Sequence, residues 1–169
     1  HGVVTDAVSF QEHGLTFLAD VVKGQKTGFF LDQREARRSV GTLSKGKRVL
    51  NLFGYSGAFS VHAAKGGAAF VATVDMSHAA LELAERQFTL NGFDPTNELK
   101  YSFLEADVMD LLARNELEGG PYDMIICDPP AFAKTDAQVE KALKAYAEVN
   151  AACLRALAPG GILGTSSCS

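Results

Sequence analysis

The sequence has few cysteines and no long apolar run. Its three cysteines form no C-x-x-C pair and fit no zinc spacing, so we expect neither a disulfide framework nor a zinc site. Its four histidines show no ligand spacing either, and we predict no metal. No apolar run approaches the ~18–20 residues that a membrane-spanning helix needs, and no signal-peptide pattern opens the chain. These absences argue against a membrane or secreted protein and favour the cytoplasm.

Composition and charge are those of one globular domain. The chain has 169 residues, of which 47% are hydrophobic and 21% charged, and this length can bury a core. The net charge of −4 excludes a uniformly basic protein that coats nucleic acid, but it leaves room for a local basic patch. Because the chain opens with His1-Gly2 and no Met, we expect it to be a piece of a longer protein.

One stretch of the sequence is basic. Six of the 16 basic residues fall between Arg34 and Arg48, where only Glu35 opposes them. They are Arg34, Arg37, Arg38, Lys45, Lys47 and Arg48. A charge run is usually a solvated face, but this one could also contact the phosphates of RNA.

Short apolar runs alternate with helical patterns along the chain. Residues 8–22 predict a β-hairpin with a turn at 12–14, and 24–28 predict a loop. Strands are predicted at 49–53, 70–74, 101–104, 122–127 and 162–165, and helices at 58–65, from the cap Ser77 to Asn91, and at 137–157. The apolar face of the last helix is predicted to hold Val139, Leu143, Tyr146, Cys153 and Leu157. This alternation predicts an α/β fold, a mostly parallel sheet with helices on both faces.

Polar side chains follow the predicted strands at the point where each strand ends. They are Asn51, Asp75, Asp107, Asp128 and Cys168. In open α/β sheets, ligands bind at the carboxyl ends of the strands. The sequence therefore predicts a ligand site at this edge.

The turn after the first strand of the sheet is Gly54-Tyr55-Ser56-Gly57, and Asp75 follows at the end of the next strand. Glycines let a backbone approach a ligand closely, and a carboxylate in this position can accept hydrogen bonds from ribose hydroxyls. The turn lacks the G-x-G-x-x-G pattern of dinucleotide sites, so we predict a nucleoside-containing cofactor other than a dinucleotide. Asp107 either receives an adenine amino group or caps a helix.

The segment Asp128-Pro129-Pro130-Ala131-Phe132 follows the fourth strand of the sheet. Two prolines make a rigid, extended loop. Asp128 can then bond the polar edge of a flat ring on which Phe132 packs. The alternative is a rigid turn with Phe132 packed inward.

One cysteine is a candidate nucleophile. Cys168 follows the fifth strand of the sheet at the ligand edge, where a thiol can attack a substrate. The alternative is a structural thiol. For Cys127 and Cys153 we predict core positions, and for His62 a core or edge position. Asn150 is predicted to be a satisfied buried amide.

Taken together, four segments resemble the class I S-adenosylmethionine-dependent methyltransferases, which have a Rossmann-like fold. More narrowly, they resemble the large-subunit ribosomal RNA cytosine-5 methyltransferases that carry an N-terminal PUA domain. The segments are 26–34 (KTGFFLDQR), 50–57 (LNLFGYSG), 128–132 (DPPAF) and 165–169 (TSSCS). The resemblance runs from about Val8 to Ser169.

The resemblance implies roles for the matching residues. S-adenosyl-L-methionine would be held by Phe30, Asp32, Gln33, Arg34, Asn51, Phe53, Gly54, Tyr55, Ser56, Gly57, Asp75, Met76, Ser77, Asp107, Val108 and Asp128. Ribosomal RNA would be bound by Pro129, Pro130 and Phe132, and the basic stretch itself adds Arg37 and Arg38 as candidate RNA contacts. Asp128 would hold the target base, and Cys168 would attack carbon 6 of a cytosine so that carbon 5 can take the methyl group.

The sequence departs from the family in two places. Ala131 and Phe132 stand where some cytosine-5 enzymes carry a second cysteine, which indicates a single-cysteine form. The PUA domain and the final hairpin of the sheet are not in this chain. We expect a hairpin and linker over residues 1–25 and a C-terminally incomplete methyltransferase domain over 26–169.

Two other functions stay open. A related guanine N7 methyltransferase would share segments 26–34 and 128–132 but would not need Cys168. A non-catalytic module that binds nucleosides or RNA is the alternative outside enzymes. A dehydrogenase is disfavoured by the glycine pattern.

Overall fold

The computed structural model describes residues 7–22, 28–114, 120–133 and 135–167. The hairpin strands are β1 (Val8–Glu12) and β2 (Leu15–Ala19), and the later strands are β3 (Arg48–Leu52), β4 (Phe70–Asp75), β5 (Tyr101–Glu105), β6 (Tyr122–Cys127) and β7 (Leu157–Thr165). The helices are α1 (Arg34–Leu43), α2 (Ala58–Lys65), α3 (His78–Leu90), α4 (Val108–Arg114) and α5 (Val139–Ala156), with 3₁₀ turns η1 (Leu31–Gln33) and η2 (Asp136–Gln138).

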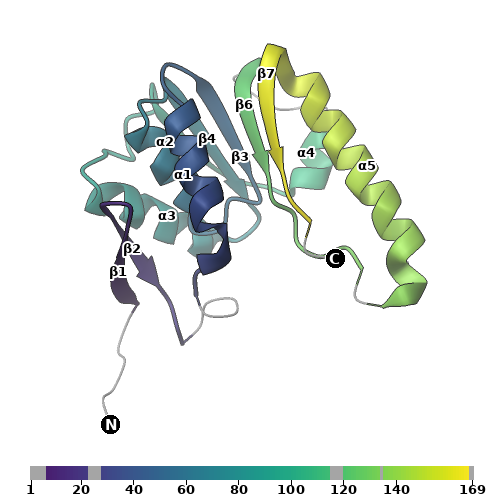
Figure 1. Ribbon diagram of the computed structural model, residues 1–169, viewed down its shortest axis with the longest axis horizontal. Helices are drawn as coiled ribbons and strands as arrows, with labels where there is room; N and C mark the ends of the chain where they lie inside the picture. Colours follow the sequence, from purple (N-terminus) through teal and green to yellow (C-terminus); the bar gives the residue numbers. More distant parts are fainter. Residues whose placement is uncertain (1–6, 23–27, 115–119, 134, 168–169) are drawn as a thin grey trace.

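The five later strands form one parallel sheet in the order β5-β4-β3-β6-β7 (Figure 1). The order reverses between β3 and β6, so the chain leaves these two strands in opposite directions at the carboxyl edge. Such a switch point opens the crevice where α/β proteins bind ligands. The predicted Rossmann-like fold with an N-terminal hairpin is confirmed.

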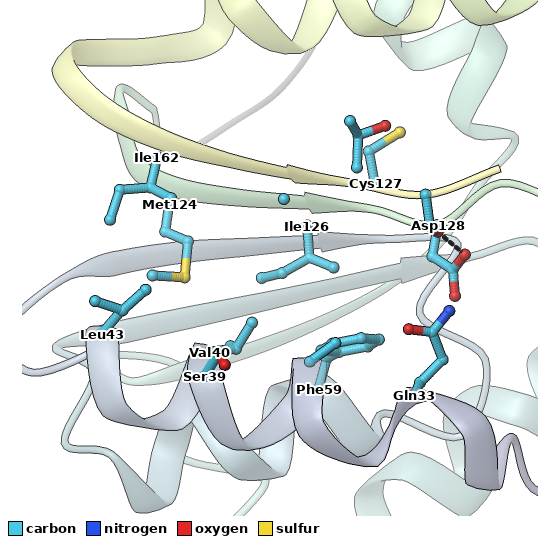
Figure 2. A pocket seen from close by; sticks show the side chains of 14 residues that line it. Gln33, Ser39, Val40, Leu43, Phe59, Met124, Ile126, Cys127, Asp128 and Ile162 are labelled. Carbon is cyan, nitrogen blue, oxygen red and sulfur yellow. Dashed lines mark hydrogen bonds between the residues drawn. The ribbon is translucent and has the colours of Figure 1, made fainter.

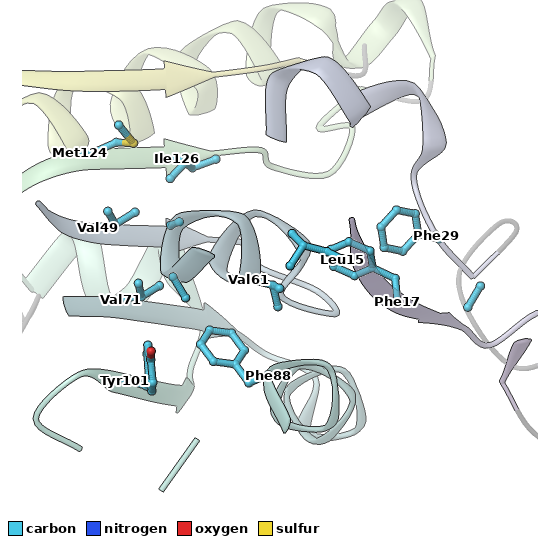
Figure 3. Close-up of a cluster of buried hydrophobic side chains, with 13 residues drawn as sticks. Leu15, Phe17, Phe29, Val49, Val61, Val71, Phe88, Tyr101, Met124 and Ile126 are labelled. Carbon is cyan, nitrogen blue, oxygen red and sulfur yellow. The ribbon is translucent and has the colours of Figure 1, made fainter. Parts of the chain in front are cut away.

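Alternate residues of each strand serve the two faces of the sheet, as the period of two requires. Val49 and Val71 lie in the cluster that α2, α3 and the hairpin cover (Figure 3). Leu50 and Ala72, the next residues, lie in the cluster that α4 and α5 cover. Because both faces are buried, the strands read as continuous apolar runs.

The hairpin is fixed to the helix that follows β4. Asn91, directly after α3, accepts a hydrogen bond from the backbone N–H of Thr16 and donates one to its carbonyl, both 2.8 Å long. One amide side chain therefore continues the hydrogen bonding at the free edge of β2. The predicted end of this helix at Asn91 is confirmed.

The boundary between the last helix and strand differs from the prediction. Helix α5 ends at Ala156, and β7 begins at Leu157, which pairs with Tyr122. Gly160 and Gly161 therefore lie within β7, at an irregularity of its pairing with β6. Because Leu157 already pairs with Tyr122, the strand begins before Pro159, Gly160 and Gly161.

The predicted apolar face of α5 is wrong in its first half. Val139 and Leu143 are exposed, by 46% and 63%. The buried residues of the helix are Ala142, Val149, Ala152 and Cys153. Three of these are small enough for the helix backbone to approach the sheet closely. No helix in the described ranges combines the length and the apolar character that a bilayer crossing requires.

A charged network is buried between the hairpin and the first two helices. Both carboxylate oxygens of Glu12 accept hydrogen bonds from Arg37, through Nε and Nη2, at 2.7 Å each. His62 places its Nε2 3.1 Å from the same carboxylate and stacks on Phe17. The side chains of Glu12, Arg37 and His62 are at most 5% exposed. The prediction that His62 is a core residue is confirmed.

Burial and pairing move the pKa values in this network. Burial lowers the pKa of His62 to about 4, although its hydrogen bond to Glu12 acts in the opposite direction. Burial alone would raise the pKa of Glu12, but hydrogen bonds and charge from Arg37, with a smaller part from His62, hold it below its ordinary value. At neutral pH the network therefore contains a carboxylate, a guanidinium and a neutral imidazole.

This protonation state predicts a loss of stability in mild acid. Between pH 6.5 and 4, His62 binds a proton in the unfolded chain but not in the folded one, so the free energy of unfolding falls as the pH falls. The loss between pH 7 and pH 4.5 should be about 2–3 kcal/mol, measured by urea unfolding across this range. His62→Gln keeps a donor for Glu12 but does not titrate, so its loss over the same range should be smaller by that amount. An identical pH dependence in both proteins would contradict the assignment.

Candidate functional site

The predicted site residues meet at the carboxyl edge of the sheet, around the switch point between β3 and β6. Asp75 is the last residue of β4, and Asp128 directly follows β6. The turn after β3, residues 53–57, lies between these two positions in the strand order. The topology therefore brings together residues that are far apart in the sequence.

The turn is held in an unusual backbone conformation. Phe53 and Tyr55 have positive φ angles of 57° and 46°, which cost energy for residues other than glycine. Gly54 donates a hydrogen bond to the carbonyl of Val74, and a Cβ at Gly54 would lie 2.6 Å from the Thr73 side chain. Glycine at this position lets the turn lie close to the sheet. The prediction from the sequence was that it lets the backbone lie close to a ligand.

Asp75 links the turn to the strand beside it. One carboxylate oxygen accepts the N–H of Tyr55 at 2.8 Å, and the other accepts the N–H of Ser77 at 2.9 Å. Ser77 in turn caps α3 by accepting the N–H of Ala80, as predicted. Each carboxylate oxygen can accept further hydrogen bonds. The half-buried Asp75 can therefore hold the turn and still receive ribose hydroxyls.

Three predicted cofactor residues have buried side chains that cannot face a ligand. Asn51 is 1% exposed and donates to Ser60 behind the turn. Ser56 is 2% exposed, and Val108 is 3% exposed in the core. Their contact with the cofactor stays a prediction, and burial favours their backbone groups for it. Met76 is 72% exposed beside Asp75.

Asp107 caps a helix. Its Oδ1 accepts the N–H groups of Met109 and Asp110 at 2.8 and 3.4 Å, at the start of α4. Of the two roles that the sequence left open, the structure shows this one. A role at adenine stays a prediction, since the side chain is exposed at the same edge.

Asp128 lies at the end of β6 and accepts a hydrogen bond from the hydroxyl of Ser166. Pro129 is buried and Pro130 exposed. The ring of Phe132 lies 4.7 Å from that of Tyr146 and packs against the core. Of the two placements that the sequence left open, the structure shows Phe132 packed inward, and a contact with the RNA base stays a prediction.

A groove of about 240 Å³ opens beside Asp128, between α1 and strands β6 and β7. Figure 2 shows Gln33 and Asp128 facing each other at one end, with Leu43 and Met124 at the other. The walls are mostly apolar. The polar end gives a flat, polar ring a carboxylate and an amide to contact.

The segment before α1 contacts the turn. The ring of Phe30 lies 5.7 Å from that of Tyr55, edge to face. Asp32 and Arg34 are exposed, and Gln33 lines the groove. This contact brings the segment next to the turn, and its predicted role in flanking the cofactor stays a prediction.

The basic stretch does not form one surface. Arg37 is 2% exposed and paired with Glu12, so it cannot contact RNA phosphates as expected. Arg48, at the start of β3, lies over the ring of Phe70 at the opposite edge of the sheet. Arg34 and Arg38 are exposed on the first turns of α1.

The cysteines divide as predicted where they are described. Cys127 and Cys153 are fully buried. A hydrogen bond with Cys153, together with burial, raises the pKa of the Cys127 thiol, which keeps it unreactive. Cys168 lies outside the described residues. The amide oxygen of Asn150 accepts a hydrogen bond from Thr165, and the residue is half-buried where a buried position was predicted.

Three residues that support the site were not predicted from the sequence. Glu12 lies two positions after Phe10 in β1, so both side chains are on the same face of the strand. This spacing could have predicted that the carboxylate points inward. Gln87 lies on the apolar face of α3 and donates to the carbonyl of Ser56 at 2.7 Å, a role that a polar residue in an apolar stripe could have signalled. Ser166 gave no signal, because its partner Asp128 is 38 residues away.

Comparisons with known proteins agree with this geometry. A family model described as S-adenosylmethionine-dependent methyltransferase matches residues 2–168. A ribosomal RNA large subunit methyltransferase of Deinococcus radiodurans is 49% identical over 164 residues, which are 97% of this chain and 40% of that protein. Ribosomal RNA large subunit methyltransferase I of Aeromonas salmonicida is 43% identical over 98% of this chain and 41% of its own. The chain thus spans about 40% of the length of these relatives.

Solved structures show the same fold. The crystal structure of the methyltransferase SMU.776, complexed with SAH (S-adenosylhomocysteine), superposes with a TM-score of 0.82 and 32% identity, over 98% of this chain and 43% of that one. The tRNA m1G37 methyltransferase of Methanocaldococcus jannaschii has a TM-score of 0.68 at 20% identity over 96% of this chain and 44% of its own, a likeness of fold alone.

The residues at the edge fit S-adenosylmethionine. Asp75 offers a carboxylate for the ribose, and the turn beside it is already held in a strained conformation by the sheet. Among the described residues, no group of three or more His, Cys, Asp or Glu is placed to hold a metal ion.

The cofactor contact predicts the effect of one substitution. Asp75→Ala should weaken the binding of S-adenosylhomocysteine by ~1.5–3 kcal/mol, the usual worth of a hydrogen bond to a charged group. Isothermal calorimetry on the full-length protein measures this. Asp94→Ala is the matched control, because Asp94 also accepts the N–H two residues on, but in a loop before β5. Binding of NAD without binding of the S-adenosyl ligand would contradict the assignment.

Proposed function

We propose that this chain, which belongs to the S-adenosylmethionine-dependent methyltransferase family, methylates carbon 5 of a cytosine in large-subunit ribosomal RNA. The names of the relatives support RNA as the substrate. The observation that carries the proposal is the contact between Asp128 and Ser166. It places Ser166, which directly follows β7 and stands two positions before Cys168 in the sequence, beside the carboxylate at the polar end of the groove.

The proposed chemistry divides between two side chains. Cys168 adds as a thiolate to carbon 6 of the cytosine, and electron density moves to carbon 5. Asp128, as the carboxylic acid, donates a hydrogen bond to the ring nitrogen and stabilises the negative charge that develops there. When bound, S-adenosylmethionine supplies the electrophilic methyl group. A base then removes the carbon 5 proton, and the thiolate leaves as the ring double bond re-forms.

The cofactor and the base are assigned to neighbouring parts of the edge. Asp75 and the turn at 53–57 hold the cofactor on the β3–β4 side, and Asp128 holds the base on the β6–β7 side. The target base must leave its stack to reach this pocket. We assign the methyltransferase domain to residues 26–169, with residues 1–25 leading into it.

The nucleophile can be tested by trapping. With a substrate that contains 5-fluorocytosine, the full-length protein should form a covalent RNA adduct at Cys168, because fluorine cannot leave as a proton does. Cys168→Ala should abolish both adduct and turnover and leave the affinity for the cofactor within about twofold. Denaturing gels and mass analysis of ribosomal RNA nucleosides measure these outcomes.

Cys127→Ala is the matched control. Its thiol is buried, so the adduct and turnover should persist, with a loss of stability of about 1–2 kcal/mol from the small cavity. Methylation by Cys168→Ala would overturn the cytosine reading and favour guanine N7. Absence of turnover and of adduct in the wild-type protein would favour the non-catalytic module.

The exposed part of the basic stretch predicts a salt effect. Arg34→Ala and Arg38→Ala should each reduce the slope of log affinity for RNA against log salt by about 0.7–0.9, because each removes one phosphate contact. Filter binding at several salt concentrations measures this. Lys141→Ala and Lys144→Ala, on the exposed side of α5, are the controls and should leave the slope unchanged. If the lysine substitutions reduced the slope as much as the arginine substitutions do, the arginines would act only through the total charge of the protein and not through specific phosphate contacts.

A further inference from the structure

Arg37 makes a third contact that the ion pair with Glu12 does not require. While Nε and Nη2 bind the carboxylate, Nη1 donates to the carbonyl of Phe30 at 2.8 Å. A bidentate pair fixes the plane of a guanidinium, and burial removes water as a competing partner. The direction of the third donor is therefore fixed by Glu12, and it holds the backbone of Phe30 in place.

Phe30 transmits this position to the turn. Its ring contacts Tyr55 edge to face at 5.7 Å. Tyr55 has a φ of 46° and donates its N–H to Asp75 at 2.8 Å. A residue in this backbone region persists only when its surroundings hold it there. The contacts thus form a continuous series from the buried carboxylate to the carboxylate at the ligand edge.

We propose that Glu12 and Arg37 are positioning residues for the cofactor site, and that they act through Phe30 on the turn at 53–57. Neither side chain touches the cofactor. The inference rests on the assignment of Asp75 and the turn to S-adenosylmethionine. It gives the buried pair a role in ligand affinity beyond its role in joining the hairpin to α1.

A double-mutant cycle on the full-length protein tests the proposal. Arg37→Lys keeps a charge for Glu12 but cannot make all three hydrogen bonds, and Phe30→Ala removes the ring contact. Each should weaken binding of S-adenosylhomocysteine by about five- to tenfold. The double variant should bind within about twofold of Phe30→Ala, because Arg37 acts through a contact that is already lost.

Two further measurements separate positioning from general stability. Hydrogen exchange of the Tyr55 amide, which donates to Asp75, should be faster in Arg37→Lys. Exchange of the buried Val71 amide, which donates to the carbonyl of Lys100 far from the turn, should change only with global stability. Val71→Ala creates a cavity near the amino end of β4, far from the turn in the register. It should lower the melting temperature without changing the affinity.

Each outcome decides the proposal. The proposal would be overturned if Arg37→Lys lowered only the stability, as Val71→Ala does, and left the affinity unchanged. It would also be overturned if the effects of Arg37→Lys and Phe30→Ala on the binding free energy were fully additive. Should Arg37→Lys fail to fold, Phe30→Ala decides, since unchanged affinity and unchanged exchange at Tyr55 would overturn the proposal. A wild-type protein that does not bind S-adenosylhomocysteine would instead overturn the cofactor assignment, which distinguishes the two failures.

Discussion

The buried ion pair between Glu12 and Arg37 is the contact on which the arrangement of the site depends. Removing two charges from water costs several kcal/mol each, and only good geometry offsets that cost. Two hydrogen bonds of 2.7 Å, a third to the Phe30 carbonyl, and His62 beside the carboxylate supply that geometry. Replacing Glu12 by an apolar residue would leave a guanidinium buried without its partner, at a cost of about 3–5 kcal/mol. A two-stranded hairpin, marginal by itself, is thereby held on the sheet.

The same constraint places the start of α1 at the ligand edge. Helix α1 begins directly after η1, and its one buried residue is Arg37. Because this side chain is fixed at the hairpin, Gln33 comes to the polar end of the groove and Phe30 comes to the turn. One side of the site is therefore formed by Phe30 and Gln33, which precede the first strand of the parallel sheet. The parallel strands form the other side through Asp75 and Asp128.

Local signals were sufficient for much of the fold, and long-range contacts account for the errors. The strand, glycine turn and helix over residues 48–65 were predicted almost to the residue, because the signals lie within a few positions. Arg37 was misread because a charge run usually marks a solvated face. Its spacing from Val40, Gly41 and Ser44 places it on the inward face of α1, but only the partner Glu12, 25 residues away, makes burial of a charge tolerable. The start of β7 likewise depends on pairing with Tyr122.

The switch point divides the edge into two parts that can vary separately. On the β3–β4 side, the shape of the turn is set by protein contacts, namely the approach of Gly54 to Thr73 and of Gly57 to Ala84 and the contact of Tyr55 with Phe30. The shape of the turn does not depend on a ligand. A cofactor therefore binds a turn that is already ordered, and binding does not have to supply the free energy for ordering it. On the β6–β7 side, Asp128 accepts a hydrogen bond from the hydroxyl of Ser166, beside a mostly apolar groove. A substitution there changes few core contacts. The proposed cofactor site is therefore rigid and shared with the fold, while the proposed chemistry depends on a few residues that follow β6 and β7.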